Sequence, residues 1–219
     1  MRLISMHRIV LAAASLLLAL PVSPSALAQG TSFKDTSMLR APAGSPVALY
    51  VFEDLECPAC SHAFPITRAA AEKYKIPLLH HDFPLKMHIW SLDAAIIARY
   101  IQDKISFQAA EEYRRAVFAN QVSIASKDDL NAFTQKYFQS HGRQLPFVID
   151  PSGRFAAEVH GDYTLGERVG LTQTPTIFIV TQHDFKQVSD VTQLYAMLDT
   201  TIAENPGAAP AKARKTVHR

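Results

Sequence analysis

The feature that most constrains the fold of this chain is a pair of cysteines at the point where one hydrophobic pattern changes into another. A nearly continuous apolar run with β-forming residues, 46–52, is typical of a buried strand. Cys57 and Cys60, the only cysteines of the chain, follow this run, and from Cys60 to residue 74 apolar residues recur with helical spacing. The sequence therefore predicts a strand that delivers Cys57 to the start of a helix.

The rest of the chain continues the alternation of patterns. Three more segments have the composition of strands: 76–83, 174–180 and 183–188. Five more have helical periodicity: 91–104, 107–118, 127–138, 153–169 and 191–204. Ser126, with Asp129 three residues later, is a capping signal for the third of these helices. We therefore predict an α/β domain over 46–204, with an all-helical insertion at about 88–168.

The first residues of the chain predict export. Arg2 and Arg8 give a positive start, 9–20 is a run of apolar and small residues, and Ala28 ends an A-x-A cleavage pattern, which together form the layout of a signal peptide over 1–28. The run is shorter than the roughly 20 residues of a spanning helix. We expect cleavage near Ala28 rather than the alternative, an uncleaved anchor, and a location in the periplasm or otherwise outside the cytoplasm, where disulfides persist.

Composition also sets expectations for the two ends of the mature chain and for its partners. Residues 29–45 are rich in Ala, Ser, Thr, Gly and Pro and predict a flexible leader, and 205–219 predicts a disordered basic tail. The chain has 22 Lys and Arg against 20 Asp and Glu. Because the two ends hold an excess of basic residues, the body is mildly acidic. It shows no basic face with interleaved aromatic residues, so a nucleic-acid partner is not expected.

Three kinds of chemistry are open to the two cysteines. A zinc site would need more ligands, and the candidates are His62, His80, His81 and His88. Two of these are adjacent, so on a strand they point to opposite faces. A structural disulfide closing so small a loop removes little chain entropy. A redox pair fits best, because the helix N-terminus favours a thiolate at Cys57, Pro58 suits the first helical turn, and Cys60 can resolve a mixed disulfide.

Three segments resemble the DsbA-type branch of the thioredoxin superfamily. They are FEDLECPACSH at 52–62, HDFPL at 81–85 with His88 following, and GLTQTPTIF at 170–178. The resemblance spans about 45–204. It implies a thioredoxin-like fold with an inserted helical cap that borders a substrate groove. It also implies that the Cys57–Cys60 disulfide is the redox group and that no separate cofactor is needed.

The same resemblance implies roles for single residues. Pro175 is expected to follow a cis peptide bond, with Thr174 offering backbone groups to an extended substrate segment; a trans Pro175 that opens an edge strand is the alternative. Pro58 and Ala59 complete the active-site loop. The implied partners are reduced or unfolded client proteins and a quinone-linked membrane oxidase of the DsbB or vitamin K epoxide reductase type.

The chain departs from the family pattern close to Cys57. Ala59 stands where some strongly oxidising members have histidine, and three acids, Glu53, Asp54 and Glu56, precede the cysteine. Their charge is expected to disfavour the thiolate and give an intermediate redox poise; a solvated turn is the alternative interpretation. Glu53 is the candidate proton carrier to Cys60 if it is semi-buried.

The histidines and aromatic residues near the motif receive structural interpretations. We expect His88 to cap or to form hydrogen bonds and His62 to be solvated. Trp90, Phe64 and Phe83 are expected to belong to the core or to the wall of the groove.

Taken together, these features predict an exported thiol:disulfide oxidoreductase that oxidises client proteins. Two alternatives remain. One is a reductase or isomerase with the same site. The other is a non-catalytic peptide-binding module with a structural disulfide. Isomerases of the superfamily are often dimers built through an extra N-terminal domain, and 29–45 is too short for one, which argues against an isomerase but not against a reductase. We expect a monomer.

Overall fold

The computed structural model describes residues 33–206, so the predicted signal peptide and most of the predicted tail lie outside the described residues. The strands are β1 (Val47–Glu53), β2 (Leu78–Asp82), β3 (Thr176–Thr181) and β4 (Phe185–Gln187). The helices are α1 (Pro58–Tyr74), α2 (Ser91–Lys104), α3 (Phe107–Asn120), α4 (Lys127–Ser140), α5 (Arg154–Val169) and α6 (Leu194–Glu204). Two 3-10 helices, Gln121–Ser123 and Val191–Gln193, follow α3 and precede α6. Every strand and helix expected from the sequence is present.

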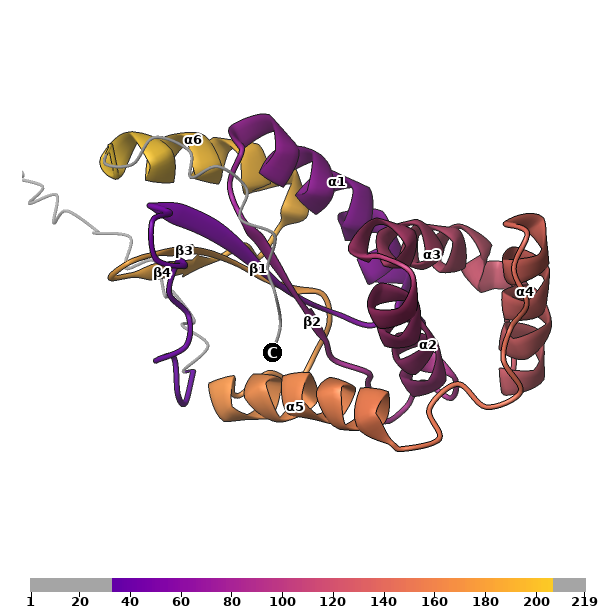
Figure 1. The fold of residues 1–219 in the computed structure, drawn as a ribbon. Helices are drawn as coiled ribbons and strands as arrows, with labels where there is room; N and C mark the ends of the chain where they lie inside the picture. The colour runs from indigo at the N-terminus through magenta and orange to yellow at the C-terminus, as the bar shows by residue number, and fades with distance from the viewer. Residues whose placement is uncertain (1–32, 207–219) are drawn as a thin grey trace, which may run out of the picture. The chain divides into compact units, whose positions relative to one another are not determined.

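The strands form one mixed sheet in the order β2-β1-β3-β4. β1 runs parallel to β2 and antiparallel to β3, and β4 pairs antiparallel with β3 in a hairpin. All residues of β1 are buried, which explains why its sequence is apolar almost throughout. Figure 1 shows α1 and α6 over one face of the sheet and α5 along the other.

Each face of the sheet has its own apolar cluster. Toward α1 and α6 the strands contribute Val47, Leu49, Val51, Ile177 and Ile179. Toward the other face they contribute Ala48, Tyr50, Phe52, Phe178 and Val180. The alternation follows from the period of two in a strand, and it places the end of β1 between two packed layers.

Residues 33–45, which composition predicted as part of a flexible leader, pack on the domain instead. Leu39 is only 2% exposed and belongs to the second sheet cluster. The N–H of Lys34 donates to the carbonyl of Val169 at 2.9 Å. The prediction of a flexible leader is therefore wrong for 33–45, because composition does not show which few apolar residues find a surface to cover.

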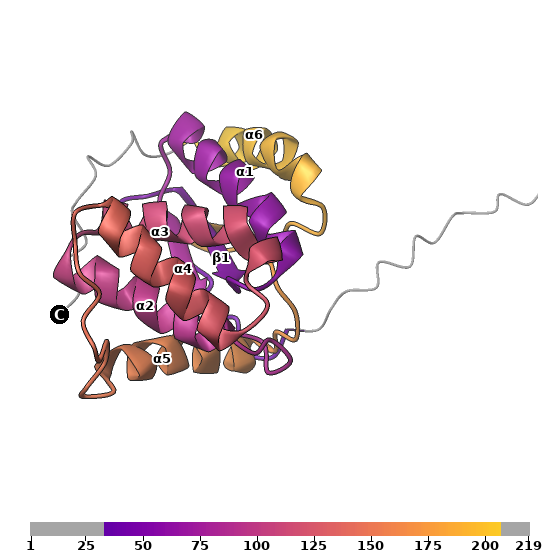
Figure 2. The same ribbon diagram turned by 90° about the vertical axis from the view of Figure 1, so that its right-hand side faces the viewer.

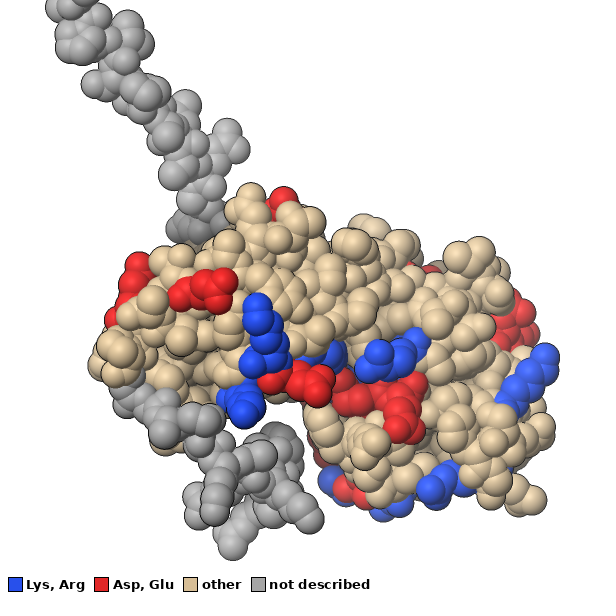
Figure 3. All heavy atoms as spheres, turned by 90° about the horizontal axis from the view of Figure 1, so that it is seen from above, with Lys and Arg blue, Asp and Glu red and all other residues tan. Residues whose placement is uncertain are grey.

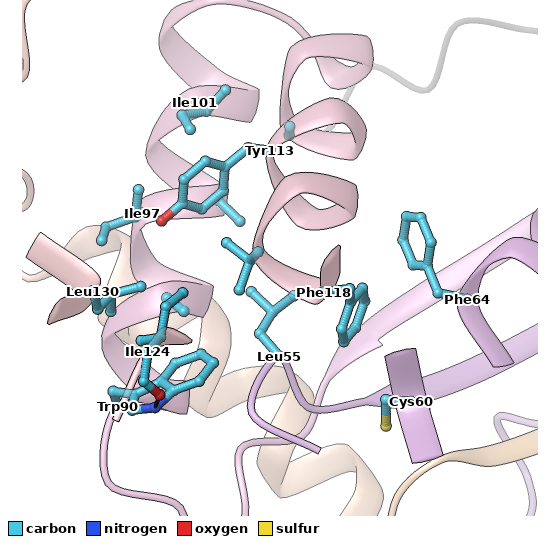
Figure 4. Packing of buried hydrophobic residues seen from close by; sticks show 14 of the residues in the cluster. Leu55, Cys60, Phe64, Trp90, Ile97, Ile101, Tyr113, Phe118, Ile124 and Leu130 are labelled. Carbon is cyan, nitrogen blue, oxygen red and sulfur yellow. Dashed lines mark hydrogen bonds between the residues drawn. The ribbon is translucent and has the colours of Figure 1, made fainter. Parts of the chain in front are cut away.

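Helices α2, α3 and α4 form a bundle beside the sheet (Figure 2). The side chains of Ser106 and Ser126 cap α3 and α4 by accepting N–H bonds from Ala109 and Asp129, the second as predicted. The bundle core is continuous with the cysteine motif (Figure 4); it includes Leu55, Cys57, Cys60, Phe64, Trp90, Ile97, Tyr113, Phe118 and Ile124. The insertion therefore forms part of the surroundings of both cysteines.

Helix α5 connects this bundle to the sheet. The ring of Phe155 lies 6.0 Å from that of Tyr100 in α2, whereas Gly166 lies against Phe83 at the end of β2. A Cβ at Gly166 would meet the Phe83 ring at 2.5 Å, so the close approach requires glycine. Of the insertion predicted at 88–168, helices α2, α3 and α4 thus lie beside the sheet, whereas α5 covers one of its faces. Among residues 33–206, no helix is long and apolar enough to cross a membrane.

Candidate active site

The two cysteines lie where the sequence predicted them, at the start of α1. β1 ends at Glu53, and after a short turn Cys57 is the N-cap residue of the helix, with Pro58 in its first turn. Both thiols are free in this structure. Cys57 is 6% exposed and Cys60 is fully buried, whereas Pro58 and Ala59 between them are exposed. A large partner can therefore reach the Cys57 side of the pair first.

The surroundings of Cys57 favour its thiolate. A hydrogen bond from the Cys60 thiol is the largest cause that lowers the pKa of Cys57, to about 6. Burial opposes this shift, and the N–H groups of Cys60 and Ala59 add to it. These N–H groups belong to the first turn of α1, where no helical carbonyl is available to them. Cys57 is thus the better nucleophile of the pair.

The surroundings of Cys60 have the opposite effect. Burial raises the pKa of the Cys60 thiol far above its ordinary value, and the hydrogen bond to Cys57 and the charge of Glu53 raise it further. One contact lowers it: the N–H of Asp54 points at the Cys60 sulfur, with a nitrogen–sulfur distance of 3.4 Å. The two thiols therefore divide into an ionised and a protonated partner, as a nucleophile and a resolving cysteine require.

The proline loop before β3 lies against this pair. The Thr174–Pro175 bond is cis, which confirms the prediction. The Cys57 sulfur lies 3.3 Å from the Thr174 carbonyl oxygen, a contact that joins residues more than a hundred positions apart. The site thus brings together the distant motifs on which the resemblance rests.

Glu53 is buried deeply rather than partly. It is 2% exposed, both of its oxygens accept from the Arg68 guanidinium, at 2.9 and 3.0 Å, and His80 Nε2 lies 3.0 Å from Oε1. Burial raises the pKa of Glu53, but the charges of Arg68 and His80 outweigh it and bring the pKa down to about 2. A carboxylate so firmly ionised is a poor proton carrier, so the geometry does not favour the role predicted for Glu53.

Asp54 is also buried, but it is held by N–H groups. Its Oδ1 accepts from the N–H of Glu56 at 2.7 Å, and its Oδ2 accepts from the N–H of Leu85 at 2.6 Å and contacts His88 Nδ1 at 2.7 Å. The hydrogen-bonding role expected of His88 is confirmed. Glu56 accepts from the N–H of Trp90 at 2.7 Å. The solvated-turn interpretation is therefore wrong for the acids before Cys57.

Sequence reasoning missed one residue of the site. Gln121, just after α3, donates through Nε2 to the carbonyl oxygens of Leu55 and Cys57, at 2.7 and 3.1 Å. It ties the helical bundle to the turn that carries the nucleophile. A glutamine between two helices has no pattern that predicts such a contact, since its partners lie more than sixty residues away.

A second cluster of charges surrounds Asp82 at the end of β2. Arg114 contacts both of its oxygens, at 2.6 and 3.2 Å, and Arg99 donates to Oδ2 at 2.6 Å. Arg99 also pairs with Asp162 of α5. Burial raises the pKa of Asp82, but the two arginines hold it well below its usual range. This cluster joins β2 to three helices.

The histidines considered as zinc ligands have other partners. His80 and His81 point to opposite faces of β2, as predicted, toward Glu53 and Asp162 respectively. His88 contacts Asp54, and His62 is exposed. Within 33–206, no group of three or more His, Cys, Asp or Glu side chains is arranged to hold a metal ion.

The aromatic residues expected in the core are there. Phe64, Phe83 and Trp90 are each 2% exposed. On the face that carries α1 and α6, Lys and Arg lie close to Asp and Glu, and most of the surface is uncharged (Figure 3).

Comparison with known proteins places this geometry in context. A family model described as thioredoxin matches residues 34–200. Similar solved structures include a cysteine variant of α-DsbA1 from Wolbachia pipientis, with a TM-score of 0.60 at 17% identity over 76% of this chain and 90% of that one. DsbA2 of Pseudomonas aeruginosa has a TM-score of 0.54 at 17% identity, over 74% of this chain and 91% of that one. A periplasmic thioredoxin-like protein from Salmonella enterica serovar Typhimurium gives 0.58 at 18%, over 74% and 88%. No curated protein matches the chain. At these identities the similarity shows a shared fold.

Proposed function

Because the chain belongs to the thioredoxin family, and the matched segment contains Cys57, Cys60 and the cis-proline loop, we propose that it is a protein thiol:disulfide oxidoreductase that oxidises client proteins. The observation that carries the proposal is the opposite effect of the surroundings on the two thiols. The pKa of Cys57 is lowered to about 6, while that of Cys60 is raised. A purely structural disulfide needs no such difference between its sulfurs.

The proposed reaction begins with Cys57 and Cys60 joined as a disulfide. A client thiolate attacks the Cys57 sulfur, a client–Cys57 bond forms, the Cys57–Cys60 bond breaks, and the electron pair stays on the Cys60 sulfur. A second client thiolate then attacks the client sulfur of the mixed disulfide and releases Cys57 as a thiolate. The client has lost two electrons and gained a disulfide, and the protein holds two reduced cysteines.

The proposed direction rests on how well the reduced protein holds its thiolate. A thiolate that is stabilised in the reduced protein makes the disulfide a stronger oxidant. The pKa of about 6 for Cys57 lies between the values of about 7 for thioredoxin and about 3.5 for DsbA. We therefore propose an intermediate redox poise that favours oxidation.

The proposed location and partners follow from the predicted signal peptide and the family. Export would place the protein among reduced or unfolded clients in the periplasm or an equivalent compartment. One similar structure is described as a periplasmic thioredoxin-like protein, which supports this proposal. Each cycle leaves two reduced cysteines, so an oxidant must restore the disulfide. We propose a quinone-linked membrane oxidase of the DsbB or vitamin K epoxide reductase type, acting on a monomer.

The test is the equilibrium reduction potential of the Cys57–Cys60 pair in glutathione buffers. A value toward that of DsbA, about −120 mV, supports an oxidant, and a value near that of thioredoxin, about −270 mV, favours the reductase alternative. Mixed disulfides with cellular proteins should accumulate in the Cys60→Ala variant and be absent from Cys57→Ala. If neither variant traps a client, the peptide-binding alternative is favoured.

A further inference from the structure

The step in which Cys60 leaves presents a problem that the proposed function does not solve. Cys60 is fully buried, and burial disfavours its thiolate. When a client attacks Cys57, however, the electron pair of the broken bond passes to the Cys60 sulfur. In the reduced protein the Cys60 sulfur carries its own proton, because its pKa is raised. When Cys60 leaves, its sulfur has no proton, and Cys57 is bonded to the client and has none to donate. Another donor is needed at that moment.

The N–H of Asp54 is in the right place. Its nitrogen lies 3.4 Å from the Cys60 sulfur, within the range of an N–H···S hydrogen bond, and it is a backbone group that keeps its proton throughout the reaction. A donor fixed in advance toward a sulfur that becomes negative stabilises the charge without reorganising. Donors aimed at a developing anion act in the same way in acyl transfer.

The Asp54 carboxylate explains why this N–H is fixed. The residue is 2% exposed, and three donors hold its carboxylate from two directions: Glu56 on the turn itself, and Leu85 and His88 on the loop after β2. Asp54 also accepts through its carbonyl from the N–H of Cys57 at 3.1 Å. The Asp54 N–H is therefore held in place both by the contacts of the Asp54 carboxylate and by the hydrogen bond to the Asp54 carbonyl.

We propose that Asp54 assists the departure of Cys60, an inference that rests on the proposed exchange reaction. Its backbone N–H stabilises the leaving thiolate, and its carboxylate acts as the positioning group that keeps this N–H on the sulfur. The role differs from that of Glu53, whose charge raises the pKa of Cys60 and so opposes the thiolate.

The proposal and simple electrostatics predict opposite changes in the rate of Cys60 departure when Asp54 loses its charge. Asp54→Asn removes a negative charge, which by itself would stabilise a nearby thiolate and speed the departure of Cys60. The amide, however, has one acceptor oxygen in place of two, so it cannot accept from both Glu56 and the Leu85–His88 side. The N–H then loses its fixed position, and we expect departure to become slower.

The experiment measures attack by glutathione on the oxidised protein, followed by acid quench and a count of free thiols by mass spectrometry. We expect Asp54→Asn to react about tenfold more slowly than wild type. Alkylation of Cys57 in the reduced protein should change by less than about twofold. The matched control is Glu56→Gln, which removes the same charge two residues away and still accepts from Trp90; its exchange rate should stay within about twofold of wild type.

The outcomes separate this inference from the proposed function. A wild-type protein that does not react with glutathione contradicts the proposed function itself. A wild type that reacts, with an Asp54→Asn variant that reacts equally fast or faster, overturns only the role of Asp54. Equal slowing of exchange and of Cys57 alkylation also overturns it, because it indicates general loosening of the turn.

A second variant keeps the test decisive if Asp54→Asn does not fold. His88→Ala removes one of the three donors from the carboxylate and leaves the other two. We expect its exchange rate to fall about threefold, with the exposed His160→Ala on α5 as the control. An unchanged rate in a folded His88→Ala protein counts against the proposal.

Discussion

Two junctions join the helical bundle to the sheet domain, and they differ in the side chains that fill them. The apolar junction consists of Leu55, Cys57, Cys60 and Phe64 packed against bundle residues such as Phe118 and Trp90. The charged junction consists of Glu53, Asp82, Arg68, Arg99 and Arg114. The first surrounds the thiols with apolar side chains, and burial among them raises the pKa of Cys60. In the second, each charge has a partner of opposite sign. The reactive pair thus lies beside buried charges that are already satisfied.

The difference teaches how sensitive each junction is to substitution. Apolar contacts have no direction, so a side chain of similar size can replace another at modest cost. Buried ion pairs need a partner for each charge, and removal of one partner leaves the other unpaired in a medium of low polarity. The charged junction should therefore be the more fragile of the two.

The largest effect is expected from Arg114→Met. Arg114 is 1% exposed and contacts both oxygens of Asp82, so its loss leaves a buried carboxylate with less compensation. We expect the free energy of unfolding to fall by about 3–5 kcal/mol. The control is Arg115→Met on the same helix, where an exposed cation–π contact to Phe64 is worth about 0.5 kcal/mol. If chemical denaturation shows equal losses of unfolding free energy for the two variants, the buried ion pairs of the charged junction do not stabilise the fold more than an exposed contact does.

The next largest effect is a dependence of the free energy of unfolding on pH. A carboxyl whose pKa is lower in the folded state stabilises the fold above its unfolded pKa, and this stability is lost as pH falls toward the folded pKa. For Glu53 the window runs from 4.5 down to about 2. We expect about 3 kcal/mol to be lost across it. Denaturation curves of Glu53→Gln should show a smaller loss over the same pH range; an equal slope would exclude Glu53 as the source.

Gln121→Met tests the tie between the bundle and the reactive turn. The change keeps the length of the side chain but removes the donors to Leu55 and Cys57, so we expect a loss of about 2 kcal/mol. Gln108→Met, where the amide makes an exposed contact to Glu112, is the matched control and should leave the denaturation midpoint close to wild type. A loss no larger than that of the control would mean that the turn is held by its other contacts.

The smallest effect is expected in the apolar junction. Phe118→Leu removes a ring whose centroid lies 5.0 Å from that of Phe64 and replaces it with another apolar side chain. We expect a loss of about 1 kcal/mol. A loss in thermal or chemical unfolding as large as that of Arg114→Met would reverse the comparison between the two junctions.

The sequence allowed the order of strands and helices and the positions of the thiols and of the cis proline to be predicted. These features depend on local patterns and on a distinctive pair of motifs. The burial of Glu53 could not be predicted in the same way, because its partner Arg68 is one arginine among many and its pairing depends on how α1 crosses the sheet. The packing of 33–45 was missed for a related reason, since Leu39 is one apolar residue in a polar stretch.

The edges of the sheet have a consequence for a protein proposed to meet unfolded chains. Strands at an edge offer unpaired backbone groups to any extended segment, which invites aggregation. Here one edge strand, β4, spans only Phe185–Gln187, with Lys186 at its centre. The other, β2, ends in His80, His81 and Asp82, whose side chains are engaged by helices and by Glu53. The two edges of the sheet therefore offer an extended segment little room to add a strand.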